Sequence, residues 1–152
     1  MRFFRAGSNV PLTLAFLCAM SASSHAQDSR EKGNSILCIH LTFISMLAAA
    51  KTCFPERDSE RIAVMETVIG EMDSFVLRNH PDATPETLAA FHERHAEVGR
   101  RGALEEPRCQ AAGGNIIAVY EAFKVDTPLE KLRELPDTLL AVDRVPTINP
   151  CF

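Results

Sequence analysis

The hydrophobic positions of this chain follow helical spacing over most of its length, and the most apolar stretch covers residues 35–53. This stretch has almost no polar face, which is typical of a helix buried among other helices. Residues 55–78, starting at Pro55 or Asp58, have apolar side chains at steps of three and four and predict an amphipathic helix. We expect its buried stripe to contain Ile62, Met65, Val68, Ile69, Met72, Phe75 and Val76.

Three further helices are predicted from start and stop signals. Residues 84–99 begin with Thr84 as an N-cap and Pro85 in the first turn, and Gly99 and Gly102 are expected to end this helix. A fourth helix is expected to start at 105–107, where two acids precede a proline. The fifth is short, covers 129–135 after a capping box at Thr127, and is interrupted by Pro136.

Together these segments predict an all-α fold, namely a small antiparallel four-helix bundle with a short fifth helix, stapled by two disulfides. Gly70 lies inside the second helix, where glycine costs about 1 kcal/mol relative to alanine, so we expect a close helix crossing there. Gly113 and Gly114 are expected to kink the fourth helix or to pack against the central one. The conformation of residues 136–152 is left open.

The first 26 residues are interpreted as a secretory signal peptide. Arg2 and Arg5 form a basic start, residues 10–20 form a short apolar run, and residues 24–26 (SHA) form a small-x-small cleavage signal. The apolar run is shorter than the roughly 20 residues of a membrane-spanning helix. We therefore expect a mature chain of residues 27–152, folded as one helical domain and located in the periplasm or secreted, with no stable membrane span.

Charge favours some partners over others. The whole chain has 16 basic and 20 acidic residues; loss of Arg2 and Arg5 leaves 14 basic ones and a net charge near −6. This acidity disfavours nucleic acid and anionic lipid as partners and would suit a basic protein. The acidic residues Glu66, Glu71 and Asp73 on the second helix are the interaction surface that the sequence suggests.

The four cysteines of the mature chain are expected to form two disulfides, Cys53–Cys109 and Cys38–Cys151. Cys38 and Cys53 lie about 22 Å apart if they share a helix, whereas a disulfide needs Cα atoms within about 7 Å. In an up-down-up-down bundle, Cys53 and Cys109 lie at one end and Cys38 and the tail at the other. The crossed pairing, Cys38–Cys109 and Cys53–Cys151, is an alternative that requires residues 99–107 to run the length of the bundle.

The histidines are the candidate metal ligands. His92 and His95, at positions i and i+3 of the third helix, can share one face and hold a transition metal. The sequence reveals no third ligand for them, and His40 is interpreted as a hydrogen-bonded core residue. We therefore predict that the protein contains no cofactor and no bound metal.

No catalytic motif is found, so we predict a protein that is not an enzyme. Its size, compartment and acidity are those of a protein-interaction module, such as an inhibitor of, or an immunity protein against, a secreted toxin. The alternative is a carrier of a small ligand or metal, which would use the bundle interior or the His92/His95 pair.

Overall fold

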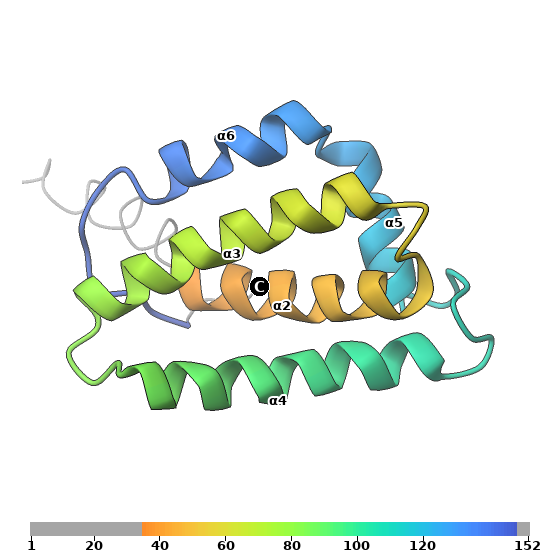
Figure 1. Ribbon diagram of the computed structural model, residues 1–152, viewed down its shortest axis with the longest axis horizontal. Coiled ribbons are helices and arrows are strands. Elements are labelled where there is room, and N and C mark those ends of the chain that lie inside the picture. The colour runs from red at the N-terminus through yellow and green to blue at the C-terminus, as the bar shows by residue number, and fades with distance from the viewer. Residues whose placement is uncertain (1–34, 149–152) are drawn as a thin grey trace, which may run out of the picture. The chain divides into compact units, whose positions relative to one another are not determined.

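The computed structural model describes residues 35–148 and contains five helices and no strand within them, which confirms the all-α class. The segment predicted to be a signal peptide and Cys151 lie outside the described residues. The central helix α2 is flanked by α3 and α4, and each runs antiparallel to the helix before it (Figure 1). The bounds are α2 Ile36–Cys53, α3 Ser59–Asn79, α4 Pro85–Leu104, α5 Ile116–Asp126 and α6 Leu129–Leu139.

Burial of α2 and α3 accounts for their sequence patterns. All seven residues of the expected α3 stripe are buried, which confirms that prediction. Helix α2 has the length and hydropathy of a membrane span, with a mean hydropathy of 1.7. It also packs against α3, α4 and α5, and such packing explains the same apolar composition in a core helix.

A close helix crossing lies between α2 and α4 and uses small residues. A Cβ atom added to Gly99 would lie only 2.1 Å from the carbonyl oxygen of Ser45, so the two backbones meet there. Ala49 and Ala103, one turn further along each helix, are fully buried. Two predictions were wrong. A Cβ atom on Gly70 would meet nothing from another helix within 4 Å, and Gly99 and Gly102 both lie inside α4, which ends at Leu104.

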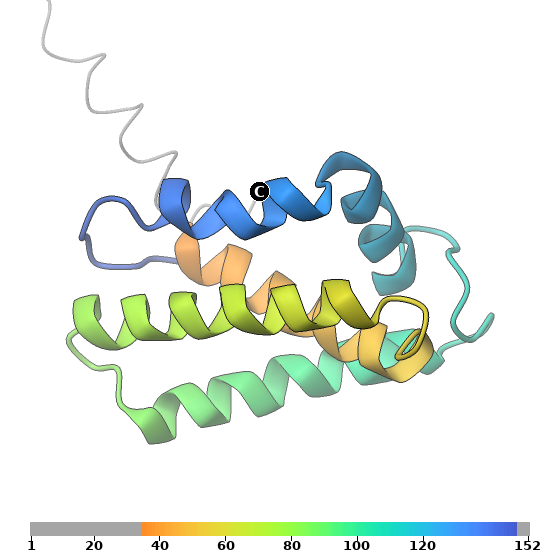
Figure 2. The same ribbon diagram turned by 45° about the horizontal axis from the view of Figure 1, so that its top comes forward.

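The second half of the chain differs most from the expected bundle. The predicted helix from residue 105 is wrong, because Cys109, Gly113 and Gly114 have positive φ angles that a right-handed helix cannot contain. Helix α5 instead begins at Ile116, where the side chain of Asn115 caps it. Neither glycine packs against α2. As Figure 2 shows, α5 crosses the end of the first three helices and α6 returns along α3.

Helix α6 also departs from its predicted form. Its N-cap residue is Pro128, with no side-chain cap bond, so the capping box expected at Thr127 is wrong. The helix continues through Pro136 to Leu139, and Pro136 is itself buried. By contrast, Thr84 caps α4 as expected, with Pro85 in the first turn.

The Cys53–Cys109 disulfide is confirmed, with Cα atoms 5.4 Å apart. It joins the end of α2 to the loop after α4. Cys53 and Cys109 therefore lie at the same end of these helices, as predicted, although Cys109 is not helical. At the opposite end, the amide of Leu37 donates to the carbonyl of Thr147 at 3.2 Å, which returns the tail to the start of α2.

A buried carboxylate fastens α5 to the start of α3. Asp58 accepts hydrogen bonds from Arg57 at 2.8 Å, Tyr120 at 3.0 Å and Lys124 at 3.1 Å. Burial raises the pKa of the Asp58 carboxyl, but the bonds from Arg57, Lys124 and Tyr120 outweigh burial and lower it to about 2. The group is therefore ionised in the folded protein at neutral pH.

The close crossing predicts opposite effects for two glycine-to-alanine changes. Gly99→Ala should lower the free energy of unfolding by about 1–3 kcal/mol, because its methyl group would meet the Ser45 backbone. Gly70→Ala, on an open helix surface, should raise that free energy by about 1 kcal/mol. Urea unfolding of both variants measures this, and a stable Gly99→Ala protein would contradict the close crossing.

The position of the tail extends the disulfide prediction to Cys151. About four residues, or roughly 13 Å of extended chain, separate Thr147 from Cys151, and Cys38 lies next to Leu37. Non-reducing peptide mapping of the oxidised protein should therefore recover a Cys38–Cys151 peptide as well as Cys53–Cys109. A cross-link between Cys53 and Cys151 would refute this arrangement of the tail.

The depressed pKa of Asp58 predicts an acid-dependent loss of stability. Its unfolded value is 3.8, so its contribution is present above about pH 4 and is lost as the pH falls through about 2. A difference of this size corresponds to about 2 kcal/mol. The gap in unfolding free energy between wild type and Asp58→Asn should therefore be widest near neutral pH and close in acid. A gap that does not change with pH would contradict this assignment.

Candidate functional site

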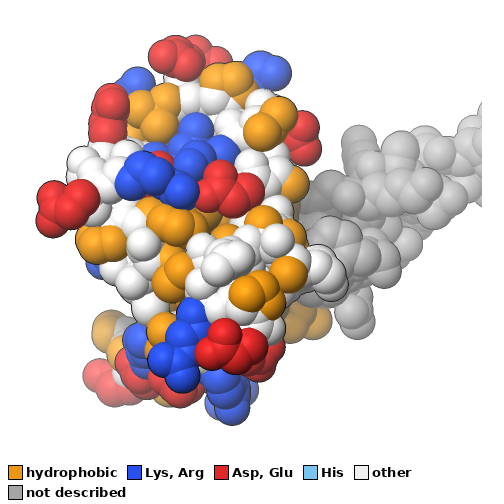
Figure 3. Space-filling view, turned by 90° about the vertical axis from the view of Figure 1, so that its right-hand side faces the viewer, with side chains coloured by type: hydrophobic (Ala, Val, Ile, Leu, Met, Phe, Trp, Pro, Cys, Tyr) orange, Lys and Arg blue, Asp and Glu red, His pale blue; other side chains and the backbone are white. Residues whose placement is uncertain are grey.

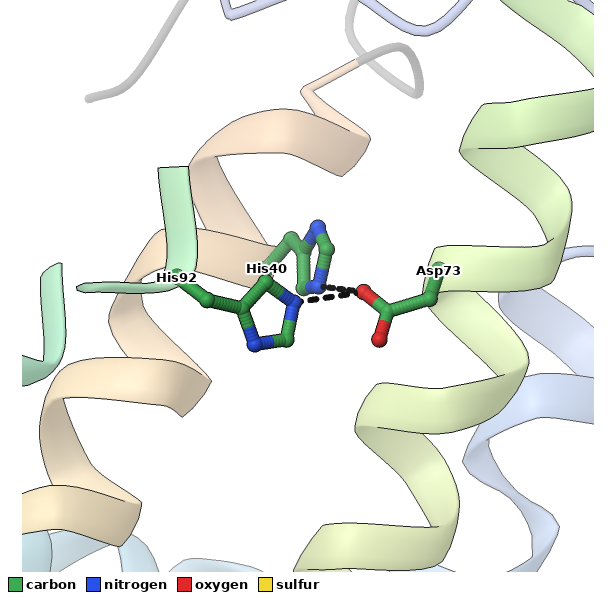
Figure 4. Close-up of side chains that lie close together, drawn as sticks. All are labelled: His40, Asp73 and His92. Carbon is green, nitrogen blue, oxygen red and sulfur yellow. Dashed lines mark hydrogen bonds and ion pairs between the residues drawn. The ribbon is translucent and has the colours of Figure 1, made fainter. Parts of the chain in front are cut away.

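Three helices bring two histidines and one aspartate to a single point. His40 from α2 and His92 from α4 both direct Nε2 toward the same oxygen, Oδ1 of Asp73 on α3 (Figure 4). The two nitrogen–oxygen distances are 2.8 Å for His40 and 2.7 Å for His92. We call these three residues the His–Asp–His cluster.

The fold creates this convergence from residues far apart in the sequence. His40 lies in the first half of α2, before the close crossing at Ser45 and Gly99, and His92 precedes that crossing on α4 by two turns. Asp73 follows the buried Met72, so it lies at the margin of the apolar stripe of α3. A second tie holds the crossing, because the Ser45 hydroxyl donates to the carbonyl of His95 at 3.0 Å.

The cluster is buried on one side and open on the other. The side chain of His40 is 0% exposed, whereas those of Asp73 and His92 are 25% and 31% exposed. Burial raises the pKa of the Asp73 carboxyl, but its bonds to His40 and His92 outweigh this and lower the pKa to about 2. Asp73 is therefore a carboxylate at neutral pH and supplies a fixed negative charge.

His40 is fully buried and its Nε2 is paired with Asp73, as expected of a core histidine with a polar partner. Among the described residues its Nδ1 has no hydrogen-bond partner, whereas its Nε2 lies 2.8 Å from Oδ1 of Asp73. Its ring is packed against Phe91, with centroids 5.4 Å apart, and against the edge of His92 at 5.3 Å. Most buried polar side-chain atoms have a hydrogen-bond partner, so Nδ1 of His40 is unusual in lacking one.

The donor set fits a transition-metal ion. One donor atom from each residue lies within 4.8 Å of the others. Ligands at about 2.0–2.1 Å from a tetrahedral ion are about 3.3 Å apart, so each histidine nitrogen would move about half an ångström away from Oδ1 of Asp73. Two imidazole nitrogens with one carboxylate oxygen suit zinc, iron, cobalt, nickel or copper better than magnesium or calcium.

The predicted pair of His92 and His95 does not meet at one point. Only His92 reaches Asp73, while the ring of His95 packs against Phe91 with centroids 4.5 Å apart. Burial, and then the nearby positive charge of Arg94, lower the pKa of His95. The sequence did not identify His40 and Asp73 as candidate ligands, because only the packing of the helices brings them next to His92.

The three acids suggested as an interaction surface are also separated by the fold. Glu66 is exposed and forms an ion pair with Lys51 of α2. Glu71 is exposed and borders a groove between α3 and α6, whereas Asp73 belongs to the His–Asp–His cluster. They therefore occupy three different surroundings.

Comparison with known proteins identifies no relative. No protein-family model, no curated protein sequence and no solved structure matches this chain. The arrangement of the described side chains is therefore the basis for inferring a function.

Proposed function

We propose that this protein binds one divalent transition-metal ion through His40, Asp73 and His92 and acts as an exported metal carrier. The observation that carries the proposal is the convergence of both Nε2 atoms on Asp73 Oδ1, at 2.8 Å and 2.7 Å. One carboxylate with two imidazoles is a familiar ligand set for such ions. The sharing of one carboxylate oxygen by two imidazole nitrogens supports it, because a metal ion could take the place of the protons between these groups.

Three protein ligands favour reversible use of the ion over a purely structural role. Structural zinc sites have four protein ligands, while sites with three leave a position for water or another molecule. The partial exposure of Asp73 and His92 would give an ion access from solvent. We therefore interpret the site as one that takes up and releases metal.

Export is part of the proposal. Residues 1–26 have the pattern of a signal peptide, and the mature chain would begin at Gln27 in the periplasm or outside the cell. The Cys53–Cys109 disulfide supports an oxidising compartment, because such bonds are rare in the cytosol. The carrier would then work outside the reducing interior of the cell.

A protein-interaction module remains the second candidate, because the mature chain is acidic and carries partly exposed apolar residues such as Val98 and Leu104. The acids proposed for its contact surface lie apart, however. Figure 3 shows that the face at the α5 end mixes apolar side chains with charges of both signs. A basic partner would therefore not be guided by one uniform acidic face there.

The metal proposal predicts one equivalent of bound Zn²⁺ or Co²⁺ in the mature, oxidised protein prepared without a histidine tag. Loss of an outer partner in a metal site weakens affinity about 10- to 100-fold, so Asp73→Asn and His92→Ala should each weaken binding by more than that. Zn²⁺ at a hundred times its Kd should raise the free energy of unfolding by about 2.7 kcal/mol.

The matched control is His95→Ala, one turn further along α4 and outside the cluster. It should leave metal affinity and stoichiometry unchanged in calorimetry. Equal losses of metal affinity in His92→Ala and His95→Ala would indicate that the metal is bound by the His92/His95 pair suggested by the sequence. No binding by the wild type would refute the carrier function.

A further inference from the structure

A groove of about 340 Å³ lies directly beside the His–Asp–His cluster. Its walls come from the same three helices, and His92 lines both the groove and the cluster. The other lining residues are Ile44, Leu47, Ala48, Lys51, Thr52, Ile69, Glu93, Ala96 and Arg100. The middle of this surface is apolar, with charged side chains at its rim.

The helix register shows why the groove and the cluster are continuous. Ile44 lies four residues after His40 on α2, and Ala96 lies four residues after His92 on α4. Ile69 lies four residues before Asp73, and α3 runs antiparallel to both helices. Residues four apart lie on the same face of a helix, so each ligand has a groove residue one turn away in the same direction. The groove therefore extends from the metal position along the helices toward Lys51 and Arg100.

Charge indicates what the groove would accept. A divalent ion held by one carboxylate and two neutral imidazoles keeps about one net positive charge, which a single anionic group would neutralise. At the far end, Lys51 pairs with Glu66. Arg100 there pairs with Glu93 and Glu97. Those cations are already balanced, so the groove offers one anionic position at the metal and an apolar surface beyond it.

We propose that the groove binds a short aliphatic monocarboxylate whose carboxylate completes the coordination of the metal ion. This inference rests on the proposed metal site. The carboxylate head would occupy a coordination position that the protein leaves open, and the hydrocarbon chain would lie against Ile44, Leu47 and Ala96. From His92 to Arg100 the groove follows two turns of α4, about 12 Å, which accommodates a chain the length of hexanoate.

The test uses mature protein already loaded with Co²⁺ and a series of acetate, butanoate and hexanoate. Each added methylene that leaves water should tighten binding about fourfold, so hexanoate should bind far more tightly than acetate. Binding should also change the visible absorption of the bound Co²⁺, because the head group becomes a ligand. Metal-free protein should bind hexanoate much more weakly.

Ala96→Phe fills the groove without removing a metal ligand, and Ala90→Phe places the same ring on the exposed surface of α4. Ala96→Phe should weaken hexanoate binding by at least about tenfold, equivalent to about 1.4 kcal/mol, with Co²⁺ affinity retained. Ala90→Phe should change neither hexanoate binding nor Co²⁺ affinity. If Ala96→Phe does not fold, the comparison of acetate, butanoate and hexanoate in the wild type still tests whether the groove binds the hydrocarbon chain.

The outcomes separate the two proposals. Equal affinity for acetate and hexanoate in Co²⁺-loaded protein would overturn the groove while leaving the metal site intact. Hexanoate binding that is unaffected by Ala96→Phe, or equal with and without Co²⁺, would also overturn it. Failure to bind Co²⁺ at all would instead refute the metal carrier, and with it the carboxylate position.

Discussion

The close contact between the backbones of α2 and α4 is the constraint on which the rest of the structure depends. Glycine at position 99 lets α4 lie against the Ser45 carbonyl, a separation that any side chain would prevent. Alanines one turn further continue the contact, and the Ser45 hydroxyl bonds to α4 within it. The contact fixes the register of α2 against α4. Each side chain that precedes the crossing on one helix therefore faces a defined side chain on the other.

That register is what gives the His–Asp–His cluster its geometry. His40 and His92 face each other from α2 and α4, and α3 packs against α2 with its apolar stripe buried. Asp73, at the margin of that stripe, is the residue through which the third helix joins them. A shift of one residue in a helix turns each side chain by about 100°, so the convergence depends on a crossing that cannot slide.

The sequence predicted those parts of the fold that depend on residues within one helix or on two helices joined by a short connection. The α3 stripe follows from apolar spacing, and the Cys53–Cys109 bond follows from helix length and the antiparallel habit of short connections. The prediction for residues 105–115 was wrong, because two acids and a proline are signals of a helix start. No sequence signal of equal strength indicates the left-handed backbone at Cys109 and Gly113. Gly70 and Gly99 look alike in sequence, and only tertiary packing distinguishes them.

The cluster was less predictable, because its three members are ordinary residues until the helices meet. His40 resembles a core histidine, Asp73 resembles a surface acid, and His92 has a nearer neighbour in His95. A histidine in a helix with almost no polar face was the strongest available signal. Such a residue needs a polar partner from another helix, and a search for acids beside the α3 stripe would have led to Asp73.

Two carboxylates in the described part of the protein, the buried Asp58 and the half-buried Asp73, differ in the groups around them. Both have a pKa lowered to about 2, so charge alone does not distinguish them. Asp58 is bonded to a lysine, an arginine and a tyrosine, which donate hydrogens and fasten α5 in place. Asp73 faces two imidazoles, each of which can offer a lone pair in its neutral form. A positive ion can replace a proton between such groups, whereas it would be repelled by the cations around Asp58. The proposed metal site therefore uses Asp73, the carboxylate whose partners can themselves become ligands.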